Sequence, residues 1–199
     1  MRTNLRTAGV ALRAMLVLTV VLGLGYPLVV TAAGQLAFPE QANGSPVVVD
    51  GETVGSELLG QSFTDDSGGP LPEYFQPRPS AAGNGYDGGA SSGSNLGPEN
   101  ADLIAAIEER RAQVAQFNGV GVDEIPADAV TASASGLDPH ISPEYAELQV
   151  ERIAAARGLE PGSLQDLVAA NVQSPDLGYL GEPTVNVLRL NVALDEMSE

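Results

Sequence analysis

Residues 14–39 read AMLVLTVVLGLGYPLVVTAAGQLAFP, a run that contains no charged side chain. As an α-helix, these residues would extend roughly 39 Å at about 1.5 Å per residue, which exceeds the roughly 30 Å hydrocarbon core of a bilayer. The run therefore predicts one N-terminal transmembrane helix, followed by a small α/β or α+β extracytoplasmic domain. Pro27 lies inside this span and would free one backbone carbonyl, which favours a kink or a packed neighbouring helix; a simple tether is the alternative.

The charges on the two sides of this span differ in sign. The chain has 199 residues, nine arginines, no lysine and 26 acidic residues, giving a net charge of −17. Residues 1–39 carry three arginines and no acid, so all 26 acids and six arginines lie in residues 40–199. The positive-inside bias then predicts a cytoplasmic segment at 1–13, an anchor at 14–39 and an acidic domain at 40–199 outside the cytoplasmic membrane.

A cleaved signal peptide is the alternative reading of the same run, with Val30, Ala32 and Ala33 as small residues around a cut. Two features favour an anchor. The run is longer than the roughly 7 to 15 apolar residues of a signal peptide, and it contains no clean A-x-A cleavage pattern.

The composition excludes several kinds of active site. The chain has no cysteine and one histidine, His140, which excludes cysteine-based zinc sites, cysteine nucleophiles and disulfide scaffolds. The absence of lysine excludes a Walker phosphate loop and a Schiff base. The large acidic excess repels phosphate backbones, so no nucleic-acid partner is expected.

Short ordered segments alternate with loops rich in Gly, Ser and Pro. We expect short strands or a hairpin within 47–59, a loop at 62–72 and a glycine-rich surface loop at 83–97. Three helices are predicted: one after Asn100 that stops at Asn118-Gly119, one from Ser142-Pro143 to Arg157-Gly158, and one over 163–172. The β-branched run 185–194 predicts a buried strand.

Two motifs admit a chemical reading. Gly83, Gly85 and Gly88 match G-x-G-x-x-G, but neither a strand before them nor a helix after them is expected, which argues against a dinucleotide site. Asp138 and His140 are spaced like a catalytic pair, although Pro139 between them makes their hydrogen bond awkward. A histidine that braces the turn before the Ser142 helix is the favoured reading. Acid pairs such as Asp65-Asp66 and Glu108-Glu109 are read as solvated charge.

Several segments resemble the C subunit of the Kdp potassium-transporting ATPase, the KdpC family. They occur in order along nearly the whole chain. They are QANGS (41–45), GSELLGQ (55–61), Tyr74-Phe75 with RPSA (78–81), SNLGP (94–98), VTAS (130–133), SGLDPHIS (135–142), Gln149-Val150 with Arg152, and GEP (181–183) with VNVL (185–188).

The resemblance implies a non-catalytic subunit of a high-affinity, ATP-driven potassium uptake complex. Its partners would be a channel-like potassium-binding subunit, a P-type ATPase subunit that hydrolyses ATP, a very small membrane subunit, and membrane lipid. The family is described as an assembly factor and catalytic chaperone that raises the ATP affinity of the hydrolysing subunit. A domain outside the membrane cannot touch cytoplasmic ATP, so no cofactor of its own is expected and ATP would act through the complex.

The candidate interface or structural residues fall in the span and in the segments that carry the resemblance: Pro27, Arg78, Ser94, Asn95, Asp138, His140 and Ser142. No catalytic or metal-binding residue is expected. Two other classes of protein remain as alternatives, a membrane-anchored extracytoplasmic hydrolase and a cell-surface binding module.

Overall fold

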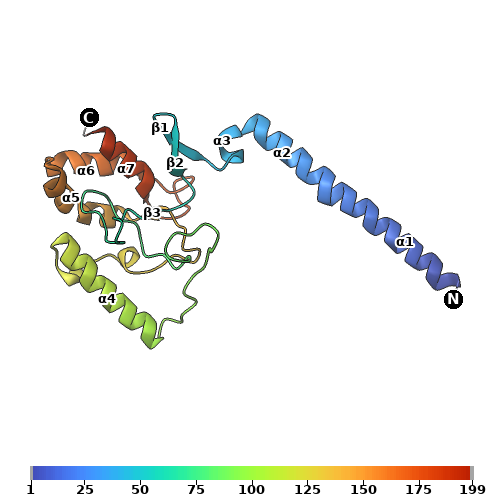
Figure 1. Cartoon of the computed structure of the whole chain (residues 1–199), viewed down its shortest axis with the longest axis horizontal. Helices are drawn as coiled ribbons and strands as arrows, with labels where there is room; N and C mark the ends of the chain where they lie inside the picture. Colours follow the sequence, from blue (N-terminus) through green and yellow to red (C-terminus); the bar gives the residue numbers. More distant parts are fainter. Residues whose placement is uncertain (1, 198–199) are drawn as a thin grey trace. The chain divides into compact units, whose positions relative to one another are not determined.

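The computed structural model describes residues 2–197, with side chains from residue 5 onward. The chain divides into two compact units, Met1–Pro46 and Val47–Glu199 (Figure 1).

The first unit is a long apolar helix. It consists of α1 (Arg2–Leu18), a π-helical segment (Thr19–Gly25) and α2 (Tyr26–Ala37), which run on as one rod in Figure 1. Leu5–Ala37 is the one stretch in the described part of the chain that is long and apolar enough to cross a membrane, with a mean hydropathy of 2.1 in its best window. The helix ends at Ala37, near the predicted end of the span, but it begins well before Ala14.

The backbone adjusts to Pro27 within the π-helical segment. Proline lacks an N–H and cannot continue the α-helical ladder to the preceding turn. The wider π turns lie directly before it, and the N–H of Tyr26 donates to the carbonyl of Val21, five residues back. After α2, the short helix α3 (Pro39–Ala42) is tied back by a pair of amide hydrogen bonds between Gln35 and Asn43, at 3.2 and 3.3 Å.

The second unit begins with the predicted hairpin. Strands β1 (Pro46–Val49) and β2 (Glu52–Ser56) form a two-stranded sheet. The turn between them is Asp50-Gly51, with φ of 50° and 82°. Positive φ at both central positions is typical of the type I′ turn that Asp-Gly favours, so this hairpin is local in origin. Residues 83–97 contain no helix or strand, as expected.

Two helices match their predicted boundaries. In α4 (Ala101–Asn118), the Asn100 side chain accepts hydrogen bonds from the N–H groups of Asp102 and Leu103, and Gly119 ends the helix at φ 69°. In α5 (Pro143–Arg157), Ser142 is the N-cap and Gly158 ends the helix at φ 69°. These boundaries were predictable because caps and left-handed glycines are local signals.

A three-stranded antiparallel sheet packs with the remaining helices. Strand β5 (Thr184–Asn186) lies between β3 (His140–Ile141) and β4 (Val172–Gln173), with Val185 opposite both Ile141 and Val172. The third predicted helix is α6 (Pro161–Ala170), two residues earlier than expected, because Pro161 occupies its first turn and Val172 belongs to β4. The antiparallel pairing makes the unit α+β.

The predicted strand over 185–194 is wrong. Only its first two residues extend β5, and the rest form helix α7 (Val187–Glu196), which Asn186 caps by accepting a hydrogen bond from the N–H of Arg189. The buried residues of α7 recur at helical spacing: Val187, Leu188, Leu190, Asn191 and Leu194. Packing of this face on the core outweighs the β propensity of the run.

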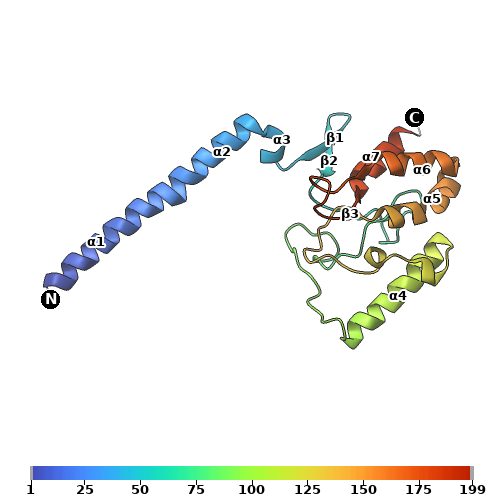
Figure 2. The ribbon, with the colours of Figure 1, turned by 180° about the vertical axis from the view of Figure 1, so that it is seen from behind.

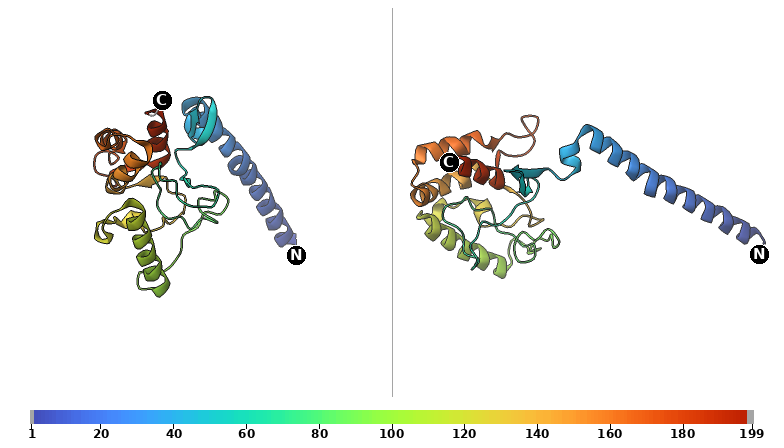
Figure 3. Two further views of the ribbon diagram at one scale, coloured as in Figure 1. Left: turned by 60° about the vertical axis from the view of Figure 1, so that its left-hand side comes forward. Right: turned by 45° about the horizontal axis from the view of Figure 1, so that its top comes forward.

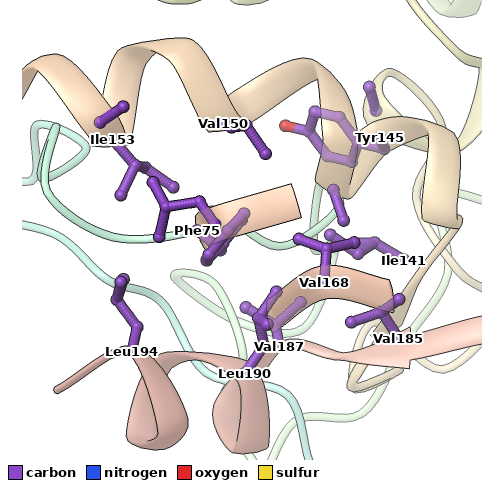
Figure 4. Packing of buried hydrophobic residues seen from close by; sticks show 14 of the residues in the cluster. Phe75, Ile141, Tyr145, Val150, Ile153, Val168, Val185, Val187, Leu190 and Leu194 are labelled. Carbon is purple, nitrogen blue, oxygen red and sulfur yellow. The ribbon is translucent and has the colours of Figure 1, made fainter. Parts of the chain in front are cut away.

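Phe75 lies at the centre of the core. It belongs to an irregular segment rather than to a helix or strand, yet it is fully buried among side chains from α5, α7 and the sheet (Figure 4). Figure 2 shows the same unit from behind, with α5, α6 and α7 gathered together and α4 apart from α6 and α7. The core thus depends on an irregular segment that other groups must hold in place.

Candidate functional site

The segment Asp138–Ser142 forms a tight turn that leads into α5. Asp138 Oδ1 accepts a hydrogen bond from the His140 backbone N–H at 3.0 Å, and His140 Nδ1 lies 3.4 Å from the same oxygen. The expectation that Pro139 makes this pairing awkward is therefore wrong. An aspartate can hydrogen-bond to the backbone two residues on, and this turn brings the His140 ring back toward the carboxylate.

Arg78 holds the other side of Asp138. Its Nη1 donates to Asp138 Oδ2 at 2.8 Å, and its Nε and Nη2 both donate to the carbonyl of Thr131 at 3.3 Å. Burial alone would raise the pKa of the Asp138 carboxyl, but the hydrogen bonds from His140 and the charge of Arg78 outweigh it and lower the pKa. The carboxylate is thus ionised and links two loops 60 residues apart in sequence.

Ser142 acts as a helix cap. Its Oγ accepts a hydrogen bond from the N–H of Tyr145 at 3.0 Å and donates to Asp128 Oδ1 at 2.9 Å, while its own N–H donates to Asp128 Oδ2 at 2.6 Å. Asp128 therefore fixes both polar groups of the cap. Among the described residues, no serine hydroxyl is hydrogen-bonded to His140, so the geometry assigns Ser142 to the helix start rather than to a nucleophile–base pair.

These residues line one cleft of about 340 Å³. Its lining consists of Arg78, Ala127, Asp128, Asp138, His140, Ile141, Ser142, Glu182, Pro183 and Thr184. Four predicted site residues, Arg78, Asp138, His140 and Ser142, meet there. Because the polar groups of Asp138 and Ser142 are engaged in structural hydrogen bonds, the arrangement favours a brace between loops over a reaction centre.

Ser94 and Asn95 lie elsewhere, on the exposed part of the glycine-rich loop. Asn95 has φ of 54° and donates to the carbonyl of Gly93 at 3.2 Å. The loop is attached to the segment before Asp138 at Ser135, whose carbonyl accepts hydrogen bonds from the N–H of Ser92 at 3.0 Å and the hydroxyl of Ser91 at 2.9 Å. It also passes close to Gly136, whose φ is 67° and where an added Cβ would lie 2.7 Å from the Ser92 carbonyl oxygen. The structure thus separates Ser94 and Asn95 from the cleft.

Two buried side-chain amides were missed by sequence reasoning. Gln149 Oε1 accepts from the backbone N–H of Gln76 at 2.7 Å, and its Nε2 donates to the Gln76 carbonyl at 3.1 Å. Asn191 does the same for Phe75, at 2.9 and 3.0 Å. Each amide pairs with one residue of the irregular segment as a neighbouring strand would. The signal that could have revealed them is a polar residue at a position where helical spacing predicts a buried side chain.

Arg152 extends this network. It donates to Asn118 Oδ1 at 2.9 Å, to Gln149 Oε1 at 2.8 Å and to the carbonyls of Pro72 and Tyr74, and it lies 4.4 Å from the centre of the Phe117 ring. Burial lowers its pKa to about 10, which leaves it charged at neutral pH. Asp65 is also more than solvated charge, because its Oδ1 accepts from the N–H groups of Ser67 and Gly69 and closes the loop there.

A sequence model described as KdpC, the c chain of K⁺-transporting ATPases, matches residues 8–196. The chain belongs to the KdpC family. The match includes both the apolar helix and the second unit, so the family resemblance seen in the sequence segments is confirmed over nearly the whole chain.

Individual KdpC relatives are similar over at least 90% of their length. A potassium-transporting ATPase KdpC subunit of Kineococcus radiotolerans is 55% identical over 193 residues, which cover 96% of this chain and 95% of the relative. KdpC subunits of Caulobacter vibrioides and Mycobacterium tuberculosis are 54% and 49% identical. The alignments cover 93% and 94% of this chain, and 90% and 96% of those relatives.

Proposed function

We propose that this KdpC-family chain is the accessory subunit of an ATP-driven potassium uptake complex and assists both its assembly and its turnover. The observation that carries the proposal is the family match, which includes the apolar helix together with the second unit. Its partners are a channel-like potassium-binding subunit, a P-type ATPase subunit and a very small membrane subunit.

The proposed topology is a single-pass anchor with the N-terminus in the cytoplasm and the acidic unit outside. Two features support it. Leu5–Ala37 is long enough to cross a bilayer, and Arg6 and Arg13 lie toward its N-terminal end while all 26 acids follow it. The acidic unit then lies on the side from which potassium arrives, opposite to cytoplasmic ATP.

Catalytic assistance therefore acts through the complex. We propose that the chain raises the ATP affinity of the hydrolysing subunit without touching the nucleotide, because the membrane separates the two. The anchor packs against the channel-like subunit, and the acidic unit lies near its outer mouth. A charge of −20 on residues 40–199 raises the local concentration of cations, an effect that salt screens.

Purification of the tagged full chain from potassium-limited cells, in mild detergent, tests the proposal. The expected result is copurification of a P-type ATPase whose turnover rises with potassium and whose apparent ATP affinity falls when the chain is omitted. A chain that purifies alone and hydrolyses generic ester or peptide substrates would support the anchored hydrolase instead. A chain that purifies alone without activity would indicate a binding module.

A further inference from the structure

The loop between β4 and β5 presents an apolar tip. Leu177, Tyr179 and Leu180 have exposed fractions of 82%, 73% and 51%, and they lie within four consecutive residues. The loop projects away from the helices in the right-hand view of Figure 3, where it follows α6 in the colour sequence. An apolar group this exposed on a soluble unit marks an interaction site.

The tip is held rigid by its own backbone. Asp176 and Leu180 exchange both backbone hydrogen bonds, at 3.0 and 2.9 Å, and the N–H of Tyr179 also donates to the Asp176 carbonyl at 3.2 Å. Leu177 and Gly178 have φ of 55° and 82°, the positive pair of a type I′ turn. A leucine in this region is strained, and backbone strain of this kind clusters at functional sites.

The surrounding charges favour a protein over a lipid surface. No basic residue lies between Arg157 and Arg189, while Asp176 and Glu182 flank the tip. Loops and helices that bind anionic lipid carry Lys or Arg beside their apolar residues, and this tip carries the opposite charge. Exposed Leu and Tyr side chains on a hydrogen-bonded turn, with acidic neighbours, fit an apolar pocket rimmed by basic residues.

We propose that residues 175–181, the tip hairpin, are a preformed anchor that inserts Leu177, Tyr179 and Leu180 into an apolar, basic-rimmed pocket on the outer surface of a membrane subunit of the complex. This inference rests on the proposed function. The ten residues from the end of α2 at Ala37 to Val47 reach at most about 35 Å, which keeps the second unit close to the membrane that holds its partners.

Leu177→Asn separates binding from folding. Asparagine tolerates positive φ, and Asn-Gly is the preferred type I′ pair, so this variant keeps or raises the unfolding midpoint while it removes the apolar anchor. We expect the amount of partner subunit retained per tagged chain in the purified complex to fall roughly tenfold. Tyr179→Ser gives a second variant with the same expected loss. Val122→Asn, at an apolar position 49% exposed in the short 3₁₀ helix Val122–Glu124, is the matched control and retains the wild-type amount.

Two further measurements test whether the acidic residues beside the tip contribute to binding and whether the tip inserts into lipid instead. Association of the wild type weakens with added salt, and Asp176→Asn reduces this salt dependence. Because the chain has no tryptophan, Tyr179→Trp gives a single reporter in vesicles that contain the full chain alone. Its quenching by phosphatidylcholine with brominated acyl chains would overturn the inference in favour of lipid insertion.

The two proposals fail in different ways. If wild-type chain retains its partners and the tip variants retain them equally, the anchor is wrong and the proposed function stands. If wild-type chain retains no ATPase or channel-like subunit, both are overturned.

Discussion

The side-chain amide of Asn191 forms both of its hydrogen bonds with the backbone of Phe75, at 2.9 Å from the Phe75 N–H and 3.0 Å to its carbonyl. This pairing joins α7 to the irregular segment that carries Phe75, the largest of the fully buried side chains. Without Asn191, the buried N–H and carbonyl of Phe75 would need a neighbouring strand as hydrogen-bond partner, and none of the described strands pairs with this segment.

Asn191→Leu is therefore expected to destabilise the second unit strongly. The substitution leaves the N–H and carbonyl of Phe75 buried without partners, which costs about 2–4 kcal/mol in the free energy of unfolding. Urea unfolding of the full chain in mild detergent, followed by circular dichroism, measures it. Gln113→Leu, an amide exposed on α4, is the control and should change stability by less than about 0.5 kcal/mol.

The Arg78–Asp138 pair predicts a specific pH dependence. The folded pKa of Asp138 lies below its ordinary value of 3.8, so its contribution to stability is complete above that value and is lost as pH falls through the lower folded pKa. At neutral pH, Asp138→Asn should cost about 2 kcal/mol, and its difference from wild type should shrink as pH falls below 3.8. A difference that stays constant across this range would contradict the assignment.

His140→Gln tests whether the Asp138–His140 pair is catalytic. Glutamine can retain a hydrogen bond to the carboxylate but cannot act as a general base near neutral pH. If the pair is a brace, potassium-stimulated ATPase turnover of the assembled complex stays within roughly twofold of wild type. Abolished turnover in a correctly assembled complex would instead indicate chemistry at this site.

Pro27→Ala tests the role of the π-helical segment. Alanine restores the missing N–H, so Thr19–Gly25 is expected to return to regular α-helix and to rotate the side chains that precede it. If this segment packs against a partner helix, less of the other subunits copurifies while the second unit keeps its unfolding midpoint. Pro98→Ala, in an exposed loop, is the comparison variant. Unchanged copurification in both would favour a simple tether.

Charge steering of potassium gives a prediction that depends on salt. Replacing the exposed acids Glu108, Glu109 and Asp123 by their amides should raise the potassium concentration for half-maximal ATPase activity at low ionic strength. At about 0.15 M salt, where the screening length is about 8 Å, wild type and variant should converge. An equal shift at both ionic strengths would argue for a direct contact instead.

The sequence by itself determined the features that depend on near neighbours or on composition. The apolar run predicted the long N-terminal helix, and caps at Asn100 and Ser142 with glycines at 119 and 158 placed α4 and α5 correctly. The hairpin at Asp50-Gly51 belongs to the same group. Each of these signals acts within a few residues, so no knowledge of the rest of the fold is needed.

Only the tertiary structure decided the features that join distant segments. The β-branched residues in 187–194 favour a strand, yet this segment belongs to α7. Helical spacing buries Leu190 and Leu194 and lets Asn191 reach Phe75, 116 residues earlier. Arg78 and Asp138 are likewise 60 residues apart in sequence. Burial and hydrogen bonding between such partners outweigh local propensity, and no pattern within either segment specifies which partner it will meet.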